Sequence, residues 1–273
     1  MKAKEGGRLS PVLKRILETK AEEIRLKKRI FSADYMRSKF HEAPSARPFA
    51  GNVLACEARH KVIAEVKRFG PGGSRLRGDF DPSGIAKSYE AAGAAAVSVL
   101  ADTVFFGGSL SIMASVRESV TLPVLCKDFF IDPFQVYEAR AYGADAILLM
   151  AVNFDSKDAF QEMVGAAEEA GVEALLEIHD EAEMGWLPSS RPTVMINNRD
   201  FRDPDLRVDV SVTKRIAPQI KTARLLVSAS GLKDSYTLEE LEKGGVDAFL
   251  IGGSLMADAD PGKALGRLLG DKR

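Results

Sequence analysis

The sequence predicts an α/β fold, a (β/α)8 barrel of the TIM type preceded by an N-terminal helical extension. Three observations predict it: a repeated turn motif, eight apolar strand-like segments, and helical patterns between these segments. A chain of 273 residues also has a suitable length for such a barrel in one domain. We expect residues 1–60 to form the extension and to pack on a barrel of residues 61–273, because about 60 residues are too few for an independent domain.

The repeated motif is a Gly-small-x-Ala turn followed by an apolar run. It begins at Gly93, Gly143, Gly171 and Gly245. A glycine that ends a helix can adopt a positive φ, and the chain then turns directly into a strand. The motif therefore predicts four strands, at Val97–Leu100, Ile147–Met150, Leu175–Ile178 and Phe249–Ile251.

Four more apolar segments lack this turn, at Val62–Val66, Pro123–Cys126, Thr193–Ile196 and Arg224–Val227. Unbroken apolar runs are typical of parallel strands covered on both faces. Helical patterns lie between the strands, at Pro82–Ala92, Ser109–Ser119, Pro133–Tyr142, Ser156–Ala170 and Tyr236–Lys243. Asp-Pro pairs mark three helix starts, at residues 81, 132 and 260. The count of eight, without a Gly-x-Gly-x-x-Gly turn after the first strand, favours a closed barrel over an open sheet.

The extension begins with a helical pattern. Apolar residues recur at helical spacing and predict an inward stripe, made of Leu13, Leu17, Ala21 and Ile24. The basic stretch from Lys20 to Arg29 reads as a solvated helix face. A short second helix is expected near Ala33–Phe40, followed by a proline-containing loop.

Composition excludes several classes of function. A net charge of −1 argues against a nucleic-acid partner, and the absence of an apolar run of about 18 residues argues against a membrane span. Residues 1–10 lack the apolar core of a signal peptide, so we expect a cytoplasmic protein. Two distant cysteines and three scattered histidines show no metal-ligand spacing, so we expect neither a metal nor a cofactor.

Active sites of such barrels lie at the carboxyl ends of the strands. Polar residues and glycines end the apolar runs there. They are Glu65, Lys67, Lys127, Glu177, Asn197, Arg199, Ser230, Gly231, Gly252 and Gly253. Buried charges cost stability unless they are paired, and such costs concentrate at functional sites. Glycine-serine turns after the last two strands offer N–H groups to a phosphate. The pattern predicts a sugar-phosphate-type substrate.

Other residues near the strand ends carry weaker signals. His179 follows Glu177 at a loop start and is a minor candidate for acid–base work, while Asp102 and Asp128 are expected to cap or orient loops. Four phenylalanines cluster after the second and third strands, at Phe105, Phe106, Phe129 and Phe130. They are expected either to pack the core and loops or to wall an aromatic ring.

Several of these segments closely resemble indole-3-glycerol phosphate synthase. They include Ile-Ala-Glu-Val-Lys at 63–67, Leu-Cys-Lys-Asp-Phe at 125–129, Glu-Ile-His-Asp at 177–180, Ile-Asn-Asn-Arg-Asp at 196–200 and Ile-Gly-Gly-Ser-Leu-Met at 251–256. The resemblance is collinear from about Pro11 to Leu269. It implies a carbon–carbon lyase (a carboxy-lyase) of tryptophan biosynthesis. That enzyme closes the indole ring of 1-(2-carboxyphenylamino)-1-deoxyribulose 5-phosphate with loss of CO2 and water.

The resemblance also implies roles for individual residues. Lys127 matches the acid that protonates the ribulose carbonyl, Lys67 a second lysine that contacts substrate and assists dehydration, and Glu177 a base or hydrogen-bond acceptor. Glu65 matches a carboxylate that orients the lysines. The substrate-binding residues implied are Asn197, Arg199, Phe129 and Leu148, and the phosphate-binding residues are Ser230, Gly231, Gly252 and Gly253. A small-molecule substrate and association with other tryptophan-pathway enzymes are implied as well.

Two positions depart from the family pattern. Gly70-Pro71-Gly72 stands where the family usually has Ser-Pro-Ser, and Ala229 stands where it has a glutamate. Two alternatives therefore stay open: a divergent paralogue acting on another amino-sugar phosphate, and a non-catalytic phosphosugar-binding barrel. Retention of Lys67 and Lys127 disfavours the second, since a binding protein gains little from two buried ammonium groups.

Overall fold

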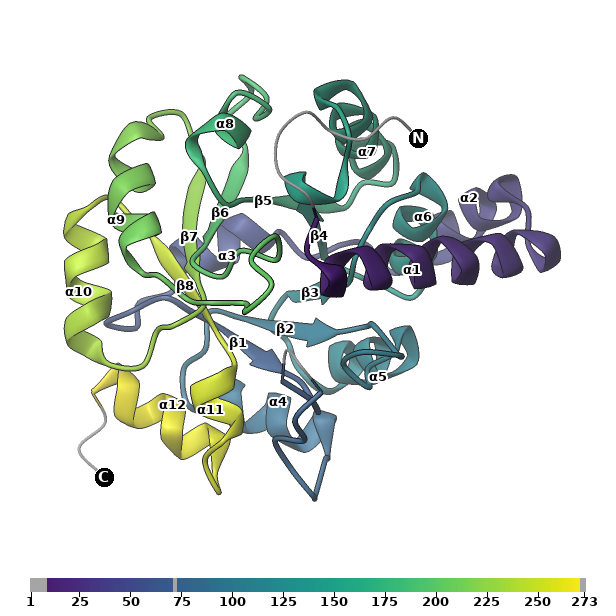
Figure 1. Ribbon diagram of the computed structural model, residues 1–273. Coiled ribbons are helices and arrows are strands. Elements are labelled where there is room, and N and C mark those ends of the chain that lie inside the picture. Colours follow the sequence, from purple (N-terminus) through teal and green to yellow (C-terminus); the bar gives the residue numbers. More distant parts are fainter. Residues whose placement is uncertain (1–8, 71–72, 271–273) are drawn as a thin grey trace.

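The computed structural model describes residues 9–70 and 73–270, and its centre is a closed barrel of eight parallel strands in sequential order (Figure 1). The last strand pairs with the first, with Leu250 beside Ile63. The strands are β1 Val62–Val66, β2 Ala96–Leu100, β3 Val124–Lys127, β4 Ala146–Met150, β5 Glu173–Ile178, β6 Thr193–Asn197, β7 Leu225–Ala229 and β8 Ala248–Ile251. The predicted (β/α)8 barrel is confirmed, with strand bounds within two residues of those expected.

Helices surround the strands (Figure 1). The longer ones are α4 Pro82–Ala91, α5 Leu110–Ser119, α6 Pro133–Ala141, α7 Lys157–Glu169, α10 Ser235–Lys243 and α12 Pro261–Leu269. Shorter ones are η1 Ala151–Asn153, α8 Glu181–Met184, α9 Ser211–Ile216, η2 Ala217–Gln219 and α11 Gly253–Met256. The Asp-Pro prediction is confirmed, because Asp81, Asp132 and Asp260 are helix N-caps whose side chains accept backbone N–H groups.

The glycine turns behave as the repeat predicted. Gly93, Gly143, Gly171 and Gly245 all have a positive φ, between 64° and 97°. In two of these turns the residue two places after the glycine is an aspartate that also binds the preceding strand. Asp145 Oδ2 accepts the N–H of Val124 at 2.9 Å, and Asp247 Oδ2 accepts that of Leu226 at 2.8 Å. These side chains link β3 to β4 and β7 to β8.

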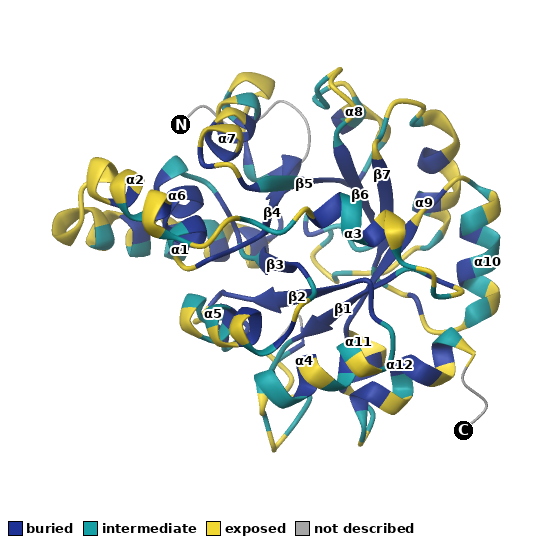
Figure 2. Ribbon diagram, turned by 180° about the vertical axis from the view of Figure 1, so that it is seen from behind, coloured by how far each residue is buried: buried dark blue, intermediate teal, exposed yellow. Residues whose placement is uncertain are grey.

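Alternation along the strands separates two apolar layers. Val62, Ala64 and Val66 pack outward with the surrounding helices, whereas Ile63 packs with the residues inside the barrel. Because successive side chains of a strand point to opposite sides, Glu65 shares the interior direction of Ile63. The strands are buried almost throughout, and exposed residues lie on the outer faces of the helices (Figure 2).

The extension contains α1 Pro11–Ile30, α2 Ala33–Glu42 and α3 Phe49–Ala55. The helices near 13–24 and 33–40 were expected, but α3 was not. Phe49 and Val53 of α3 are fully buried and belong to the apolar cluster inside the barrel, so α3 covers one end of it. The boundary at residue 60 stays a prediction.

The expected stripe on α1 is partly wrong. The buried face is made of Leu13, Ile16, Lys20 and Ile24, while Ala21 is exposed. Lys20 is only 3% exposed, so the basic stretch is not a solvated face along its whole length. The physical reason is ion pairing, because carboxylates surround the Lys20 ammonium. Among the described residues, no helix is long and apolar enough to cross a membrane.

Candidate active site

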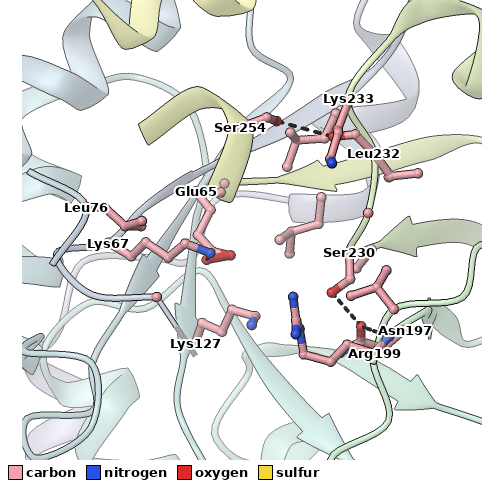
Figure 3. A pocket seen from close by; sticks show the side chains of 18 of the residues that line it. Glu65, Lys67, Leu76, Lys127, Asn197, Arg199, Ser230, Leu232, Lys233 and Ser254 are labelled. Carbon is pink, nitrogen blue, oxygen red and sulfur yellow. Dashed lines mark hydrogen bonds and ion pairs between the residues drawn. The ribbon is translucent and has the colours of Figure 1, made fainter. Parts of the chain in front are cut away.

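The carboxyl ends of the strands surround one cavity of about 610 Å³ (Figure 3). It brings together most of the residues predicted from the strand ends: Glu65, Lys67, Lys127, Asn197, Arg199, Ser230, Gly231, Gly252 and Gly253. Glu177, Phe129 and Leu148 line a narrow pocket that shares Lys127 with the cavity. All twelve predicted site residues therefore line one or the other of two neighbouring spaces.

A buried ion pair lies at the end of β1. The Lys67 ammonium is 2.8 Å from Glu65 Oε1, and the side chains are 12% and 5% exposed. Figure 3 shows the Lys127 ammonium and the Arg199 guanidinium pointing into the same space. Burial alone would raise the pKa of Glu65, but the charges of Lys67, Lys127 and Arg199 hold it below its ordinary value. Glu65 is therefore an anion that can hold lysines in position.

Glu177 lies at the end of β5 and lines the narrow pocket together with Lys127. Its Oε1 accepts a hydrogen bond from Asn197 Nδ2 at 3.0 Å and lies 3.0 Å from His179 Nε2. Its Oε2 is buried and has no hydrogen-bond partner in the described part of the chain. Burial of this oxygen without a partner is costly. The free oxygen is therefore the part of Glu177 that a substrate could engage.

His179 lies behind Glu177. It is buried, it lines neither of the two spaces, and its Nδ1 lies 3.3 Å from Glu183 Oε2. Burial would lower the pKa of His179, but Glu177 and Glu183 raise it from 6.5 to about 10. His179 is thus an imidazolium at neutral pH. Despite burial, it and the nearby Lys127 hold the pKa of Glu177 below its ordinary value.

Asn197 connects three parts of the site. Its Oδ1 accepts the N–H of Arg199 at 3.0 Å and the hydroxyl of Ser230 at 2.8 Å, while its Nδ2 binds Glu177. Arg199 is further held by a bond from its Nη1 to the carbonyl of Leu206. Asn197 thereby fixes the ends of β5, β6 and β7 relative to one another.

The turns after β7 and β8 bring backbone close to the cavity. Ser230 and Gly231 have φ of 69° and 76°, and a Cβ on Gly231 would lie 2.5 Å from Val208. A Cβ on Gly252 would lie 2.8 Å from Glu65, so only glycine fits there. The short helix α11 begins at Gly253. Backbone N–H groups of loops after the seventh and eighth strands, with a short helix, commonly bind phosphate in this fold.

Aromatic rings wall the narrow pocket. Phe106 and Phe129 have ring centroids 6.1 Å apart, and Phe201 meets Phe129 edge-on at 5.8 Å. Leu148 completes the apolar lining. Phe130 instead packs in the outer core, and Arg15 lies over the ring of Phe105. Phe106 and Phe129 are buried in the inner apolar cluster and line the narrow pocket, whereas Phe130 belongs to the outer core, so packing accounts for all three and the walling of a ring stays a prediction.

Sequence reasoning missed several residues that line the cavity, among them Phe201 and Lys233. Phe201 is a lone aromatic residue in a polar stretch, which is a usable signal. Lys233 is exposed and follows the Ser-Gly turn, and Figure 3 shows its ammonium directed inward. Among the described lining residues, four side chains are cationic (Lys67, Lys127, Arg199 and Lys233) and one is a carboxylate, Glu65.

The departures from the family pattern fall on this cavity in part. Ala229 lines it, is 3% exposed, and pairs with Asn197 and Leu250 in the sheet. Gly70 also lines the cavity, but Pro71 and Gly72 lie outside the described residues. Within the described ranges, no group of three or more His, Cys, Asp or Glu side chains could hold a metal ion.

Comparison with known proteins decides the family. The family model of indole-3-glycerol phosphate synthase matches residues 13–268. The chain belongs to the indole-3-glycerol phosphate synthase family. Proteins of that name from Laribacter hongkongensis and Neisseria meningitidis serogroup B are 36% and 37% identical to it. Each alignment covers 95% of this chain, with 99% and 100% of the relative. Indole-3-glycerol phosphate synthases are carboxy-lyases of tryptophan biosynthesis that act on a small-molecule phosphate.

Solved structures agree on the fold. A 3-hexulose-6-phosphate synthase from Salmonella typhimurium aligns with a TM-score of 0.57 and 15% identity, covering 77% of this chain and 98% of its own. A thiamine phosphate pyrophosphorylase from Pyrococcus furiosus aligns with a TM-score of 0.52 and 17% identity, covering 76% and 93%. At these identities the likeness concerns the fold alone.

Proposed function

We propose that this chain closes the indole ring of 1-(2-carboxyphenylamino)-1-deoxyribulose 5-phosphate. The observation that carries the proposal is the convergence of Lys67, Lys127 and the two carboxylates Glu65 and Glu177 beside a phosphate-type cradle and an aromatic pocket. The cavity has an excess of cationic side chains, which suits a ligand with both a phosphate and a carboxylate. The aromatic ring would lie against the apolar side chains of Phe106, Phe129 and Leu148, and their pocket of about 20 Å³ must widen to take it.

The ends of the substrate are held by different strands. The phosphate binds at the Ser230–Gly231 turn and at Gly252 and Gly253, where backbone N–H groups can donate to its oxygens. The carboxylate binds Arg199, because a guanidinium fits a carboxylate with two parallel hydrogen bonds. Asn197 is hydrogen-bonded to Glu177 and Ser230, so it keeps the two ends in register.

The first step joins two carbons. The ring carbon that bears the carboxylate attacks the ribulose carbonyl carbon, and Lys127 gives a proton to the carbonyl oxygen as it becomes a hydroxyl. The bond to the carboxylate then breaks, CO2 leaves, and the electron pair restores the aromatic ring. Glu65, 2.8 Å from the Lys67 ammonium, orients that lysine for the second step.

The second step removes water. Lys67 gives a proton to the departing hydroxyl, and the free Oε2 of Glu177 takes a proton from the neighbouring carbon. His179 keeps Glu177 ionised, which a base requires.

The proposal also includes residence in the cytoplasm and association with other tryptophan-pathway enzymes. Co-purification of those enzymes with the tagged chain tests the association.

Replacement of the acid tests the assignment. Lys127→Ala should lower kcat by about 10²–10⁴-fold, the usual contribution of a general acid, measured by indole fluorescence as substrate is consumed. Full activity in Lys127→Ala would show that another group is the acid.

The parent chain distinguishes the alternatives. Thermal stabilisation by the substrate without indole formation would favour a phosphosugar-binding barrel. Neither stabilisation nor product would favour a paralogue acting on another amino-sugar phosphate, the reading that Ala229 supports.

A further inference from the structure

A buried charge cluster lies where α1 meets the barrel. The Lys20 ammonium is 2.9 Å from Asp102 Oδ2, 3.0 Å from Asp128 Oδ1 and 3.0 Å from Glu23 Oε2. The side chains of Lys20 and Asp102 are 4% and 0% exposed. Figure 1 shows α1, in dark purple, passing in front of β3 and β4. One ammonium of the extension is therefore enclosed by carboxylates from the ends of two strands.

Both strand-end carboxylates also hold the backbone of the aromatic wall. Asp102 Oδ1 accepts the N–H groups of Phe105 at 2.6 Å and Phe106 at 3.0 Å. Asp128 Oδ1 accepts the N–H of Phe129 at 2.7 Å, and it directly follows Lys127 in the chain. The expectation that these aspartates orient loops is confirmed, and the loops are those that carry Phe106 and Phe129.

The start of α1 reaches the third aromatic side of the pocket. Ser10, the N-cap of α1, donates its hydroxyl to the carbonyl of Phe201. Phe201 contacts Phe129, which contacts Phe106. One helix of the extension therefore connects to each of the three rings around the narrow pocket.

We propose that Lys20 is a positioning residue of the active site. It holds Asp102 and Asp128 in place, and through them the Phe106 and Phe129 wall and the backbone beside Lys127. This inference rests on the proposed function to the extent that the aromatic ring of the substrate lies against Phe106 and Phe129. Without the ammonium, the buried carboxylate of Asp102 and the largely buried carboxylate of Asp128 would repel each other, and one must move or take up a proton. A displacement of about 1 Å at a reacting group can cost about 10²-fold in rate.

The other ion pairs of α1 provide a matched control. Lys27 lies 2.7 Å from Glu138 and Lys28 lies 2.6 Å from Asp132. These pairs join α1 to α6 and its N-cap, and the two lysine side chains are about half exposed, at 44% and 42%. Loss of either ion pair weakens the packing of α1 on the barrel but leaves Asp102 and Asp128, at the ends of β2 and β3, paired with Lys20.

The kinetic experiment compares full-length Lys20→Met, Lys20→Arg and Lys27→Met, each verified as folded by circular dichroism. Lys20→Met should lower kcat at least about tenfold, Lys20→Arg should recover part of the loss, and Lys27→Met should stay within about twofold of the parent. Inhibition by inorganic phosphate should be the same in all, because its cradle is on β7 and β8. Equal kcat in Lys20→Met and Lys27→Met would overturn the proposal.

Hydrogen exchange gives a readout that needs no activity. Peptides covering residues 102–108 and 127–131 should exchange faster in Lys20→Met but not in Lys27→Met, because their N–H groups lose fixed acceptors. If the parent formed no indole, the proposed function would fail while this measurement still decided the role of Lys20. If Lys20→Met does not fold, the double variant Lys20→Met, Asp102→Asn removes the repulsion between the two carboxylates. Unchanged hydrogen exchange at residues 127–131 in that double variant would refute the role of Lys20.

Discussion

Ala229 is the residue that most distinguishes this site from the family pattern. It leaves the end of β7 without a carboxylate, so the cationic side chains of the cavity face Glu65 alone among its described lining residues. Its Cβ points at the cavity, opposite Asn197 and Leu250 in the sheet. The missing group is a proton-transfer candidate as well as a charge partner for the lysines.

Restoring that carboxylate is the most direct test. Ala229→Glu should raise kcat, because it restores a proton-transfer group. One acid–base group contributes about 10²–10⁴-fold. The gain should be less than about 10²-fold, because the remaining acid–base groups already supply part of this contribution. Single-turnover indole fluorescence measures this. A lower kcat would show that the cavity is arranged around alanine.

His179 predicts a stability that depends on pH. Its pKa is raised from 6.5 to about 10, so its contribution is fully present below pH 6.5 and is lost as the pH rises through 10. The free energy of unfolding of the parent should therefore fall by more than about 1 kcal/mol between pH 7 and pH 10. Urea unfolding of parent and His179→Asn measures it. The variant should be less stable at pH 7 and should show a flatter dependence, and parallel curves would exclude the imidazolium.

Single residues also mark where sequence reasoning stops. The strand-end charges were predictable because each interrupts an apolar run. The burial of Lys20 was not, since Asp128 is 108 positions away and nothing local shows the pairing. Phe201 differs, because a lone aromatic residue in a polar stretch is a local signal, although only the tertiary structure shows which pocket it lines.

At the scale of elements, the turns determine how well boundaries can be predicted. Strands that follow a glycine turn and helices that begin at Asp-Pro were located within about two residues, because both signals are local. The short helices α3, α8, α9 and α11 were missed. No side-chain cap marks the start of α3, α9 or α11, and α8, which Asp180 caps, has only four residues. Packing on the barrel decides the conformation of such short segments.

Asp145 joins several elements and should be costly to remove. It is fully buried and accepts the N–H groups of Val124 and Arg47 and the guanidinium of Arg117. Asp145→Ala should lower the free energy of unfolding by about 3–5 kcal/mol, because it leaves a buried cation unpaired. Asp247 is the counterpart between β7 and β8, but its side chain is exposed and accepts the N–H of Leu226. Asp247→Ala should therefore cost only about 1 kcal/mol, the usual net contribution of one hydrogen bond. Urea unfolding measures both, and equal losses would contradict the difference in burial.

For the whole molecule, the distribution of charge matters more than its sum. The chain has a net charge of −1, yet its cavity is lined by four cationic side chains and one carboxylate. KM should therefore rise with ionic strength while kcat changes little, because salt screens attraction between distant charges more than short contacts between bound substrate and protein. Steady-state kinetics between 20 and 500 mM salt, on the order of a fivefold change in screening length, would show it. A KM independent of salt would rule out steering by the cavity.

Closure of the barrel has a consequence for the order of synthesis. β1 is made early, but one of its two partners is β8, near the end of the chain. Until the ribosome releases that last strand, β1 has an open hydrogen-bonding edge, and such edges recruit other chains. The turns after β7 and β8 that complete the cavity are made last as well. A nascent chain therefore acquires its protected edge and its anion-binding turns almost together, and messages truncated before β8 should yield aggregates rather than partly active protein.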